Sequence, residues 1–150
     1  MRLRTQVKQA IQCCALLAVR SGNCMTTRAL SATFDLPKDY LAKTLQALAH
    51  AKIVTASYGP GGGYRLSREA RGISILEIIE AIEGPIDSPR SKGSMLATAE
   101  PPAQALNQAV ERLIEEVNAA WQSVLAGLSI EDLLGEVGPS QRASQGESWE

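Results

Sequence analysis

Cationic and glycine residues gather in one stretch of the chain, where they could bind a polyanion. Lys38 and Lys43 lie in a segment with helical spacing, and Arg65 follows the glycine-rich loop 59–63. Lysine and arginine neutralise phosphates, and arginine also suits a narrow minor groove. A glycine-rich loop lets backbone approach a surface closely. These residues favour nucleic-acid binding, provided that a helix and a hairpin position them.

Two short helices and a hairpin are predicted between residues 26 and 67. Thr26 or Thr27 can cap a first helix that runs to Phe34. Asp35 tolerates the left-handed backbone that a break requires, and Pro37 suits the first position of a second helix.

The second helix has one apolar side, because Leu41, Leu45 and Leu48 recur at intervals of four and three. Strands are predicted at 53–57 and 64–67, on either side of the glycine loop. This order is that of a winged helix-turn-helix, a mainly α fold with a small β-hairpin wing. The alternative is a helical hairpin packed on a β-ribbon that binds no nucleic acid.

Several segments resemble one family of regulators. They are Met1-Arg2-Leu3, the Tyr40, Leu41, Leu45 and Leu48 spacing, the run from Gly59 to Leu66, and Ile75 to Ile79 followed by Glu83-Gly84. Together they resemble the winged-helix repressors typified by IscR, NsrR and CymR over about residues 1–84. The resemblance implies a homodimeric transcription regulator, often a repressor, with its second helix in the major groove and its wing on the minor groove of double-stranded DNA.

The resemblance also implies a set of DNA-binding residues. In the helix they are Lys38, Asp39, Tyr40, Lys43 and Thr44, and in the wing Tyr58, Gly59, Pro60, Gly61, Gly62, Gly63, Tyr64 and Arg65. Arg2 and Arg4 match the start of the first family helix, which approaches the DNA backbone. Pro37 and Asp39 stand where relatives often have small hydroxyl residues, and Tyr58 stands where they often have arginine.

Charge is divided between the two halves of the chain. Residues 1–74 hold eleven Lys or Arg and three Asp or Glu, a balance of +8, whereas residues 75–150 hold four and thirteen, a balance of −9. The net charge of −1 therefore hides a basic half suited to DNA and an acidic half suited to a partner or a dimer. Simple attraction between the two halves is the alternative.

The pattern divides the chain into four parts. Residues 1–84 are predicted as the DNA-binding domain, with a first helix at 3–20 and a short helix at 75–82. Residues 85–102, rich in Pro, Ser and Gly, are predicted as a mobile loop. Residues 103–134 are predicted as a dimerisation helix and a short terminal helix capped by Ser129, and residues 135–150 as a disordered tail.

The long helix carries an apolar seam that requires a partner helix. Its members are Leu106, Val110, Leu113, Val117, Trp121, Val124 and Leu128. Packing within one chain is the alternative, but the helix predicted at 75–82 is too short to cover the seam. We therefore expect two copies to pair through it.

Cysteine usage argues against an iron–sulfur cluster. Cluster-binding members of the family carry three ligand cysteines after the fourth helix, whereas this chain has no cysteine beyond Cys24. We therefore predict no cofactor and no metal site. Cys14 lies on the apolar stripe of the first helix and Cys13 lies off it. A redox pair of Cys13 and Cys24 is conceivable, but buried, inert thiols are favoured.

Other functions fit the sequence less well. The glycine loop lacks the Gly-Lys-Ser/Thr ending of a nucleotide-binding loop, and the one histidine, His50, argues against hydrolase chemistry. No apolar run is long enough to span a membrane, so a cytoplasmic location is expected. The runner-up is a sensor of a small ligand or partner protein, bound at loop 85–102, with secondary DNA affinity.

Overall fold

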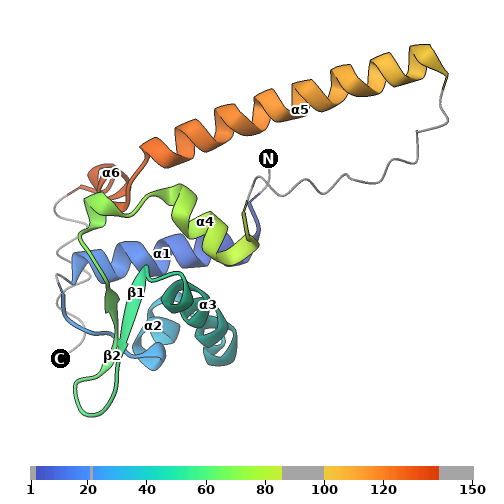
Figure 1. Cartoon of the computed structure of the whole chain (residues 1–150). Coiled ribbons are helices and arrows are strands. Elements are labelled where there is room, and N and C mark those ends of the chain that lie inside the picture. Colours follow the sequence, from blue (N-terminus) through green and yellow to red (C-terminus); the bar gives the residue numbers. More distant parts are fainter. Residues whose placement is uncertain (1–2, 21, 86–99, 139–150) are drawn as a thin grey trace.

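The structure, a computed structural model, describes residues 3–20, 22–85 and 100–138. Its elements are α1 (Thr5–Val19), α2 (Thr27–Phe34), α3 (Lys38–His50), β1 (Val54–Ser57), β2 (Gly63–Leu66), the 3-10 turn η1 (Ala70–Gly72), α4 (Ile75–Glu83), α5 (Pro101–Gly127) and α6 (Ile130–Gly135). A compact body contains every element except most of α5, which extends away from it (Figure 1). The predicted mainly α fold with a small hairpin is confirmed.

Helix α1 runs through the middle of this body and is covered on two sides. Val7 packs in a cluster with Ile79 of α4 and Leu125 of α5. Cys13 and Cys14 belong to a second cluster, which contains the buried leucines of α2 and α3. The prediction that Cys13 lies off the apolar face was wrong, because the second packed side of α1 buries it completely.

The break between α2 and α3 lies at Asp35 and Leu36 as predicted, but Pro37 occupies the N-cap of α3 and not its first helical position. The Thr26 side chain caps α2 by accepting a hydrogen bond from the Ala29 N–H at 3.1 Å. Asp35 ends α2 in the left-handed region, with φ of 51°. The Leu36 N–H donates to the Ser31 carbonyl at 3.1 Å, and the Ser31 hydroxyl donates to the Leu36 carbonyl. These bonds fix the direction in which α3 leaves α2.

Strands β1 and β2 pair antiparallel, and the register sets Thr55 opposite Arg65. The base of the hairpin is also tied to the chain before α2. Met25 and Tyr64 exchange two backbone hydrogen bonds, of 2.8 and 2.7 Å. The hairpin is therefore held against the helical body rather than attached only through its own ends.

The start of α4 is joined to the turn between α5 and α6. The Ile75 N–H donates to the Leu128 carbonyl at 2.8 Å, and the Ile130 N–H donates to the Ile73 carbonyl at 3.0 Å. Each helix begins with a capping box, formed by Ser74 with Glu77 in α4 and by Ser129 with Asp132 in α6. The end of α5 is thus fixed to the domain through backbone.

Glu77 also forms an ion pair with Arg68, which follows β2. Partial burial acts to raise the pKa of this carboxyl group. The hydrogen bonds from Ser74 and the charge of Arg68 outweigh that effect, so the pKa lies below its usual value. Arg68 in turn donates to the Lys52 carbonyl at 3.3 Å, which connects α4 to the turn between α3 and β1.

Helix α5 begins two residues earlier than predicted. Pro101 and Pro102 occupy its first turn, where a missing N–H costs nothing, so they belong to α5 and not to the predicted loop 85–102. Residues 86–99 of that loop lie outside the described residues. Helix α6 ends at Gly135, one residue later than predicted, and residues 139–150 of the predicted tail lie outside the described residues.

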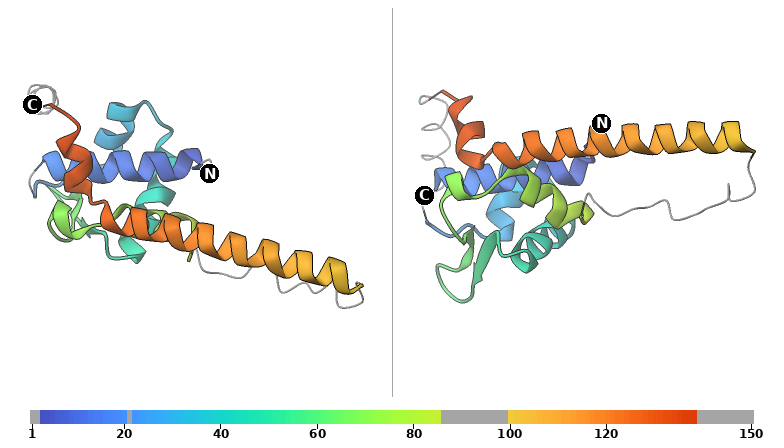
Figure 2. Two further views of the ribbon diagram at one scale, coloured as in Figure 1. Left: turned by 90° about the horizontal axis from the view of Figure 1, so that it is seen from above. Right: turned by 45° about the horizontal axis from the view of Figure 1, so that its top comes forward.

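Most of α5 has no cover from its own chain. Of its residues only Leu125 is buried, and the two further views show the helix extending well past the domain (Figure 2). No helix of the described segments is both long and apolar enough to cross a membrane.

Candidate nucleic-acid interface

Helix α3 has one buried face and one exposed face. Leu41, Leu45 and Leu48 are completely buried against the domain. The other face exposes Lys38, Asp39, Tyr40, Lys43 and Gln46. Two lysines and a glutamine can donate hydrogen bonds to phosphates and base edges, and the major groove admits a helix. The exposed face therefore has the chemistry and the shape of a recognition helix.

Thr44 does not belong to this face. Its side chain is completely buried. The hydroxyl lies 3.4 Å from the Gln6 amide nitrogen on α1 and 3.4 Å from the Tyr40 carbonyl. The prediction that Thr44 meets DNA was therefore wrong. Its position three residues after Leu41 places it on the packed side, where it helps to seat α3 on α1.

The loop of the wing (residues 58–62) is built from glycine for steric reasons. A Cβ on Gly62 would lie 2.5 Å from the Ser57 carbonyl oxygen. At Gly63, φ is +134°, and a Cβ would collide with the Met25 carbonyl group. These two glycines allow the tight turn and the close contact between the wing base and Met25. Tyr58, the first residue of the loop, is 96% exposed, so its ring is free to contact a partner.

The two wing residues that follow the turn have different surroundings. Tyr64 is half-buried, packs against the main core and is bonded to Met25 through its backbone. Arg65 is exposed on the strand next to it. Tyr64 thus anchors the wing, whereas Arg65 presents a guanidinium group to a partner.

A cleft of about 320 Å³ lies between the wing and the helix-turn-helix. Its lining includes Thr27, Arg28, Lys38, Tyr58 and Tyr64. Arg28 lies in the first turn of α2 and is exposed, and the sequence patterns did not predict it as a DNA-binding residue. A cation in the first turn opposes the helix dipole, and that mismatch was the available signal.

The basic residues at the start of α1 do not line this cleft. The Arg4 guanidinium lies 3.8 Å from a carboxylate oxygen of Glu83, at the end of α4. The Arg4 side chain is still 75% exposed, so this pair contributes little and leaves Arg4 accessible. Arg2 lies outside the described residues.

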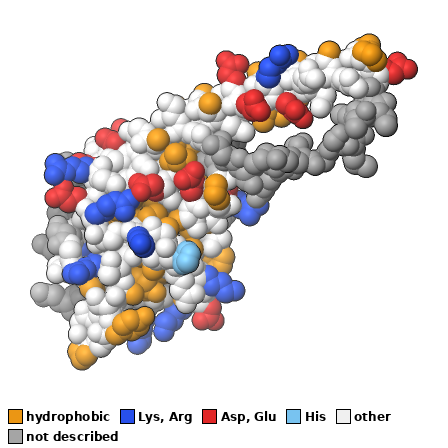
Figure 3. Space-filling model, in the orientation of Figure 1, with side chains coloured by type: hydrophobic (Ala, Val, Ile, Leu, Met, Phe, Trp, Pro, Cys, Tyr) orange, Lys and Arg blue, Asp and Glu red, His pale blue; other side chains and the backbone are white. Residues whose placement is uncertain are grey.

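The charge of the surface follows the division seen in the sequence. On the face shown in Figure 3, Lys and Arg side chains lie near the wing, whereas mainly Asp and Glu side chains lie along α5. The charged residues of α5 are one cation, Arg112, and three carboxylates, Glu111, Glu115 and Glu116. A basic surface at the wing end is the electrostatic feature expected of a DNA-binding face.

Comparison with known proteins matches residues 3–136 to the Rrf2 model, described as an iron-dependent transcriptional regulator. The chain belongs to the Rrf2 family. Among its relatives, the protein named "Putative HTH-type transcriptional regulator BadM" of Rhodopseudomonas palustris is 23% identical over 97% of this chain and 88% of its own length. The regulator IscR of Cereibacter sphaeroides is 40% identical over 48% of this chain and 47% of its own length.

Solved structures show the same fold in other family members. CymR of B. subtilis, whose structure is described as that of the global cysteine regulator, has a TM-score of 0.71 at 24% identity and covers 92% of this chain and 99% of its own. T. potens IscR has a TM-score of 0.70 at 22% identity, with 94% and 91% covered. The family match and the named relatives make this Rrf2 protein a DNA-binding transcription regulator and not an enzyme, and the solved structures show its winged helix-turn-helix fold.

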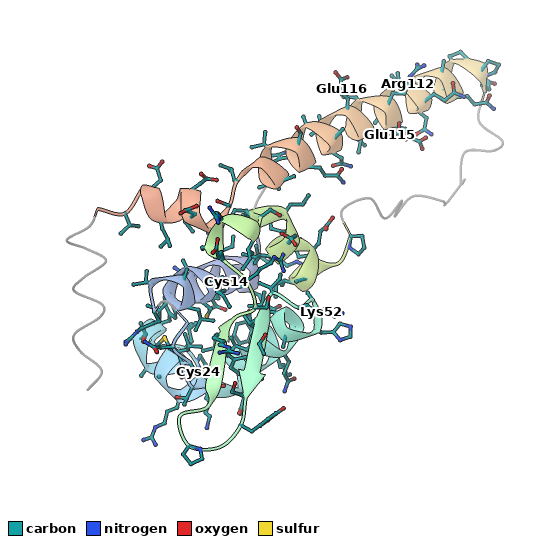
Figure 4. All side chains as sticks on the ribbon, turned by 60° about the vertical axis from the view of Figure 1, so that its left-hand side comes forward. Cys14, Cys24, Lys52, Arg112, Glu115 and Glu116 are labelled. Atoms are coloured by element: carbon teal, nitrogen blue, oxygen red, sulfur yellow. The ribbon has the colours of Figure 1, made fainter. Side chains whose placement is uncertain are left out.

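The family description raises the question of iron, and the thiols of this Rrf2 protein do not fit a cluster. Burial raises the pKa of Cys13 to about 12, and burial together with the charge of Cys13 raises that of Cys14 still further. Cys24 lies apart from Cys14, on the chain before α2 (Figure 4). Among the described residues no group of three or more His, Cys, Asp or Glu side chains could hold a metal ion. Because cluster ligands are thiolates, the buried thiols of Cys13 and Cys14 do not fit a cluster.

Proposed function

We propose that this Rrf2 protein represses transcription as a homodimer, each copy placing α3 in a major groove and its wing on the adjacent minor groove. The observation that carries the proposal is the cleft between the wing and the starts of α2 and α3. Arg28, Lys38 and Tyr58 all line it. One phosphate backbone passing along this cleft would be held from both sides, so that Lys43 contacts a further phosphate beside the major groove and Arg65 enters the minor groove.

The homodimer is supported by the exposed seam of α5. Its seven members are exposed by 39–67%, with Leu106 at the upper end and Trp121 at the lower end. An isolated soluble helix with so many exposed large apolar side chains in one row is unfavourable in water, and exposed apolar patches mark association sites. A second copy of the chain provides an identical seam for it.

We further propose that DNA binding does not require an iron–sulfur cluster. The support is the placement of Cys13 and Cys14 in the core and the absence of cysteine beyond Cys24 in the sequence. Any regulating ligand or partner protein would then act through the predicted loop 85–102, most of which joins α4 to α5. Small rotations of the dimer would change the spacing of the two α3 helices, which must match half-sites about 34–36 Å apart or a multiple of that distance.

The test is DNA affinity as a function of salt and of iron. Anaerobically purified protein is expected to be colourless, and its affinity for a DNA sequence that it selects from a random pool should be unchanged by chelator. The logarithm of that affinity should fall linearly with the logarithm of salt concentration, because phosphate contacts release counterions. A brown protein with stoichiometric iron and sulfide would contradict the cluster-free proposal, and salt-independent affinity would contradict the interface.

A further inference from the structure

The turn that ends helix α3 places a lysine in a backbone conformation that favours glycine. Lys52 lies between α3 and β1 with φ of 59°, in the left-handed region (Figure 4). The Ile53 N–H donates to the Leu48 carbonyl at 3.0 Å, and the Lys52 N–H donates to the Ala49 carbonyl at 3.0 Å. Helices that end with this pair of bonds usually carry glycine at the left-handed position, because glycine has no Cβ to clash. A lysine at that position needs other contacts to hold the turn.

Two side chains that follow β2 supply these contacts. The Ser67 hydroxyl and the Arg68 guanidinium both donate to the Lys52 carbonyl, the guanidinium at 3.3 Å. Arg68 Nε also donates to the Gly72 carbonyl at 2.9 Å, and its Nη2 donates to Glu77 Oε1. A guanidinium is planar and holds its donors in a rigid fork, so it fixes its acceptors relative to one another. Arg68 therefore ties together the end of α3, the end of η1 and the first turn of α4.

Glu77 continues this connection toward α5. Its Oε2 accepts hydrogen bonds from the backbone N–H and the hydroxyl of Ser74, at 2.9 and 3.1 Å, whereas its Oε1 accepts from Arg68. Ser74 pairs with Ser129 in a β-bridge, which joins the start of α4 to the turn where α5 ends. A series of hydrogen bonds and short backbone links thus runs from the end of α3 to the end of α5.

We infer that Arg68 is a positioning residue that fixes the angle between α3 and α5, and thereby the distance between the two recognition helices of a dimer. The inference rests on the proposed homodimer and on the proposed DNA interface. Arg68 does not line the cleft between the wing and the helix-turn-helix, so it acts without a contact to DNA. The side chains of Arg68 and Glu77 are 39% and 44% exposed, so their ion pair alone adds little stability. Its role is geometric.

This angle matters because α3 meets DNA whereas α5 meets the second copy of the chain. One base pair inserted between two half-sites moves them about 3.4 Å further apart and turns one by about a tenth of a helical turn. A rigid attachment of α3 to α5 makes binding sensitive to that change, and a loose attachment tolerates it. Because Leu41, Leu45 and Leu48 also hold α3 on the domain, loss of Arg68 should loosen the angle without unfolding the chain.

The affinity of the full chain for duplexes of different half-site spacing tests the inference. The measured quantity is the ratio of the affinity for the selected duplex to that for the same duplex with one inserted base pair. Arg68→Ala should lower this ratio by about 2- to 30-fold and leave the affinity for a duplex with a single half-site unchanged. Arg71→Ala is the matched control, since Arg71 lies in the same segment and pairs with Glu69, and it should keep the wild-type ratio.

A second variant breaks the same connection from the side of α4. Glu77→Gln leaves one side-chain oxygen where there were two, so the cap by Ser74 and the bond from Arg68 compete for it. The ratio should fall in the same direction as in Arg68→Ala, and the two effects should not add in the double variant. Additive effects would mean that the two side chains act independently, which would overturn the connection.

A glycine variant separates positioning from stability. Lys52→Gly removes the steric cost of the left-handed turn, so it should restore part of the free energy of unfolding that Arg68→Ala loses. It should not restore the spacing ratio, because glycine supplies no link between the turn and Glu77. If Lys52→Gly restored the ratio in the Arg68→Ala background, Arg68 would act only by stabilising the turn, and the inference would be overturned.

The same measurements separate the role of Arg68 from the proposed function. Monomeric wild-type protein, or wild-type protein that binds one and two half-sites equally well, would overturn the dimer on which the inference rests. A wild-type spacing preference that persists in Arg68→Ala would overturn the role of Arg68 alone. An equal loss of affinity for one and two half-sites in Arg68→Ala would also overturn it, because such a loss places Arg68 in the DNA interface or in the folded core.

Discussion

The DNA-binding domain and α5 carry the same kind of apolar spacing and differ in where that spacing is buried. Leu41, Leu45 and Leu48 of α3 are completely buried within the chain. Leu106 and Leu113 of α5 are 67% and 60% exposed. Periodicity shows that a helix face is built for burial, but it does not show which chain supplies the cover. In this protein the domain completes its own core, whereas the apolar side chains of α5 stay exposed in the single chain, and we propose that a second copy covers them.

The largest effect should come from placing charge in the α5 seam. Leu113→Asp together with Val117→Asp should convert the dimer into a monomer, because an uncompensated buried charge costs about 3–5 kcal/mol. Gln108→Asp with Ala119→Asp, on the exposed opposite face of the same helix, is the matched control and should remain dimeric. Sedimentation velocity measures both. If the variant with Leu113→Asp and Val117→Asp stayed dimeric, the seam of α5 would not be the surface that pairs two chains.

A smaller effect is expected from the wing. Arg65→Ala should weaken DNA binding by about 1–3 kcal/mol if the guanidinium reads a base or a narrow minor groove. Arg71→Ala is the control, since Arg71 is also exposed but lies on η1 and forms an ion pair with Glu69. Fluorescence anisotropy with the selected duplex measures both affinities. Equal losses in the two variants would mean that Arg65 has no specific role.

Lys43 tests the exposed face of α3 in a different way. Lys43→Ala should weaken binding evenly across DNA sequences and lower the slope of log affinity against log salt by about one, because one phosphate contact is lost. Affinities at several salt concentrations, for the selected duplex and a random one, measure the slope. An unchanged slope would show that Lys43 is not at the backbone.

Substitution of Thr44 should have the smallest effect on DNA binding. Thr44→Val removes two long hydrogen bonds of a buried hydroxyl and should lower the free energy of unfolding by about 0.5–1.5 kcal/mol. Its DNA affinity and salt slope should equal those of the wild type, because the side chain does not reach the surface. Urea denaturation and anisotropy measure the two quantities. A loss of affinity without a loss of stability would return Thr44 to the interface.

Local features of the domain could be predicted from the sequence because short-range chemistry decides them. The Thr26 cap, the left-handed Asp35 and the Ser129 cap all depend on neighbours within four residues, and the structure contains all three. The burial of Cys13 could not be predicted in this way. It depends on which helices cover α1, and one helical period identified only one of its two packed sides.

The candidate site shows the same limit. The resemblance supplied the exposed residues of α3 and the wing, but it could not separate Thr44 from Lys43, which is its neighbour in sequence. Arg28 was missed because its position depends on how the wing lies beside α2, which is fixed by the pairing of Met25 with Tyr64. Contacts between segments that are distant in sequence decide such positions.

The most direct test of the account is the mass of the complex formed on a DNA duplex that carries two half-sites. Sedimentation of the wild-type protein with this duplex should show two chains on each duplex, bound cooperatively. The variant with Leu113→Asp and Val117→Asp should bind the same duplex with one chain at a time and with much lower affinity. In this account the domain binds DNA and α5 pairs two copies of the chain. A single wild-type chain that occupies the whole site, or a variant that binds as tightly as the wild type, would contradict that claim.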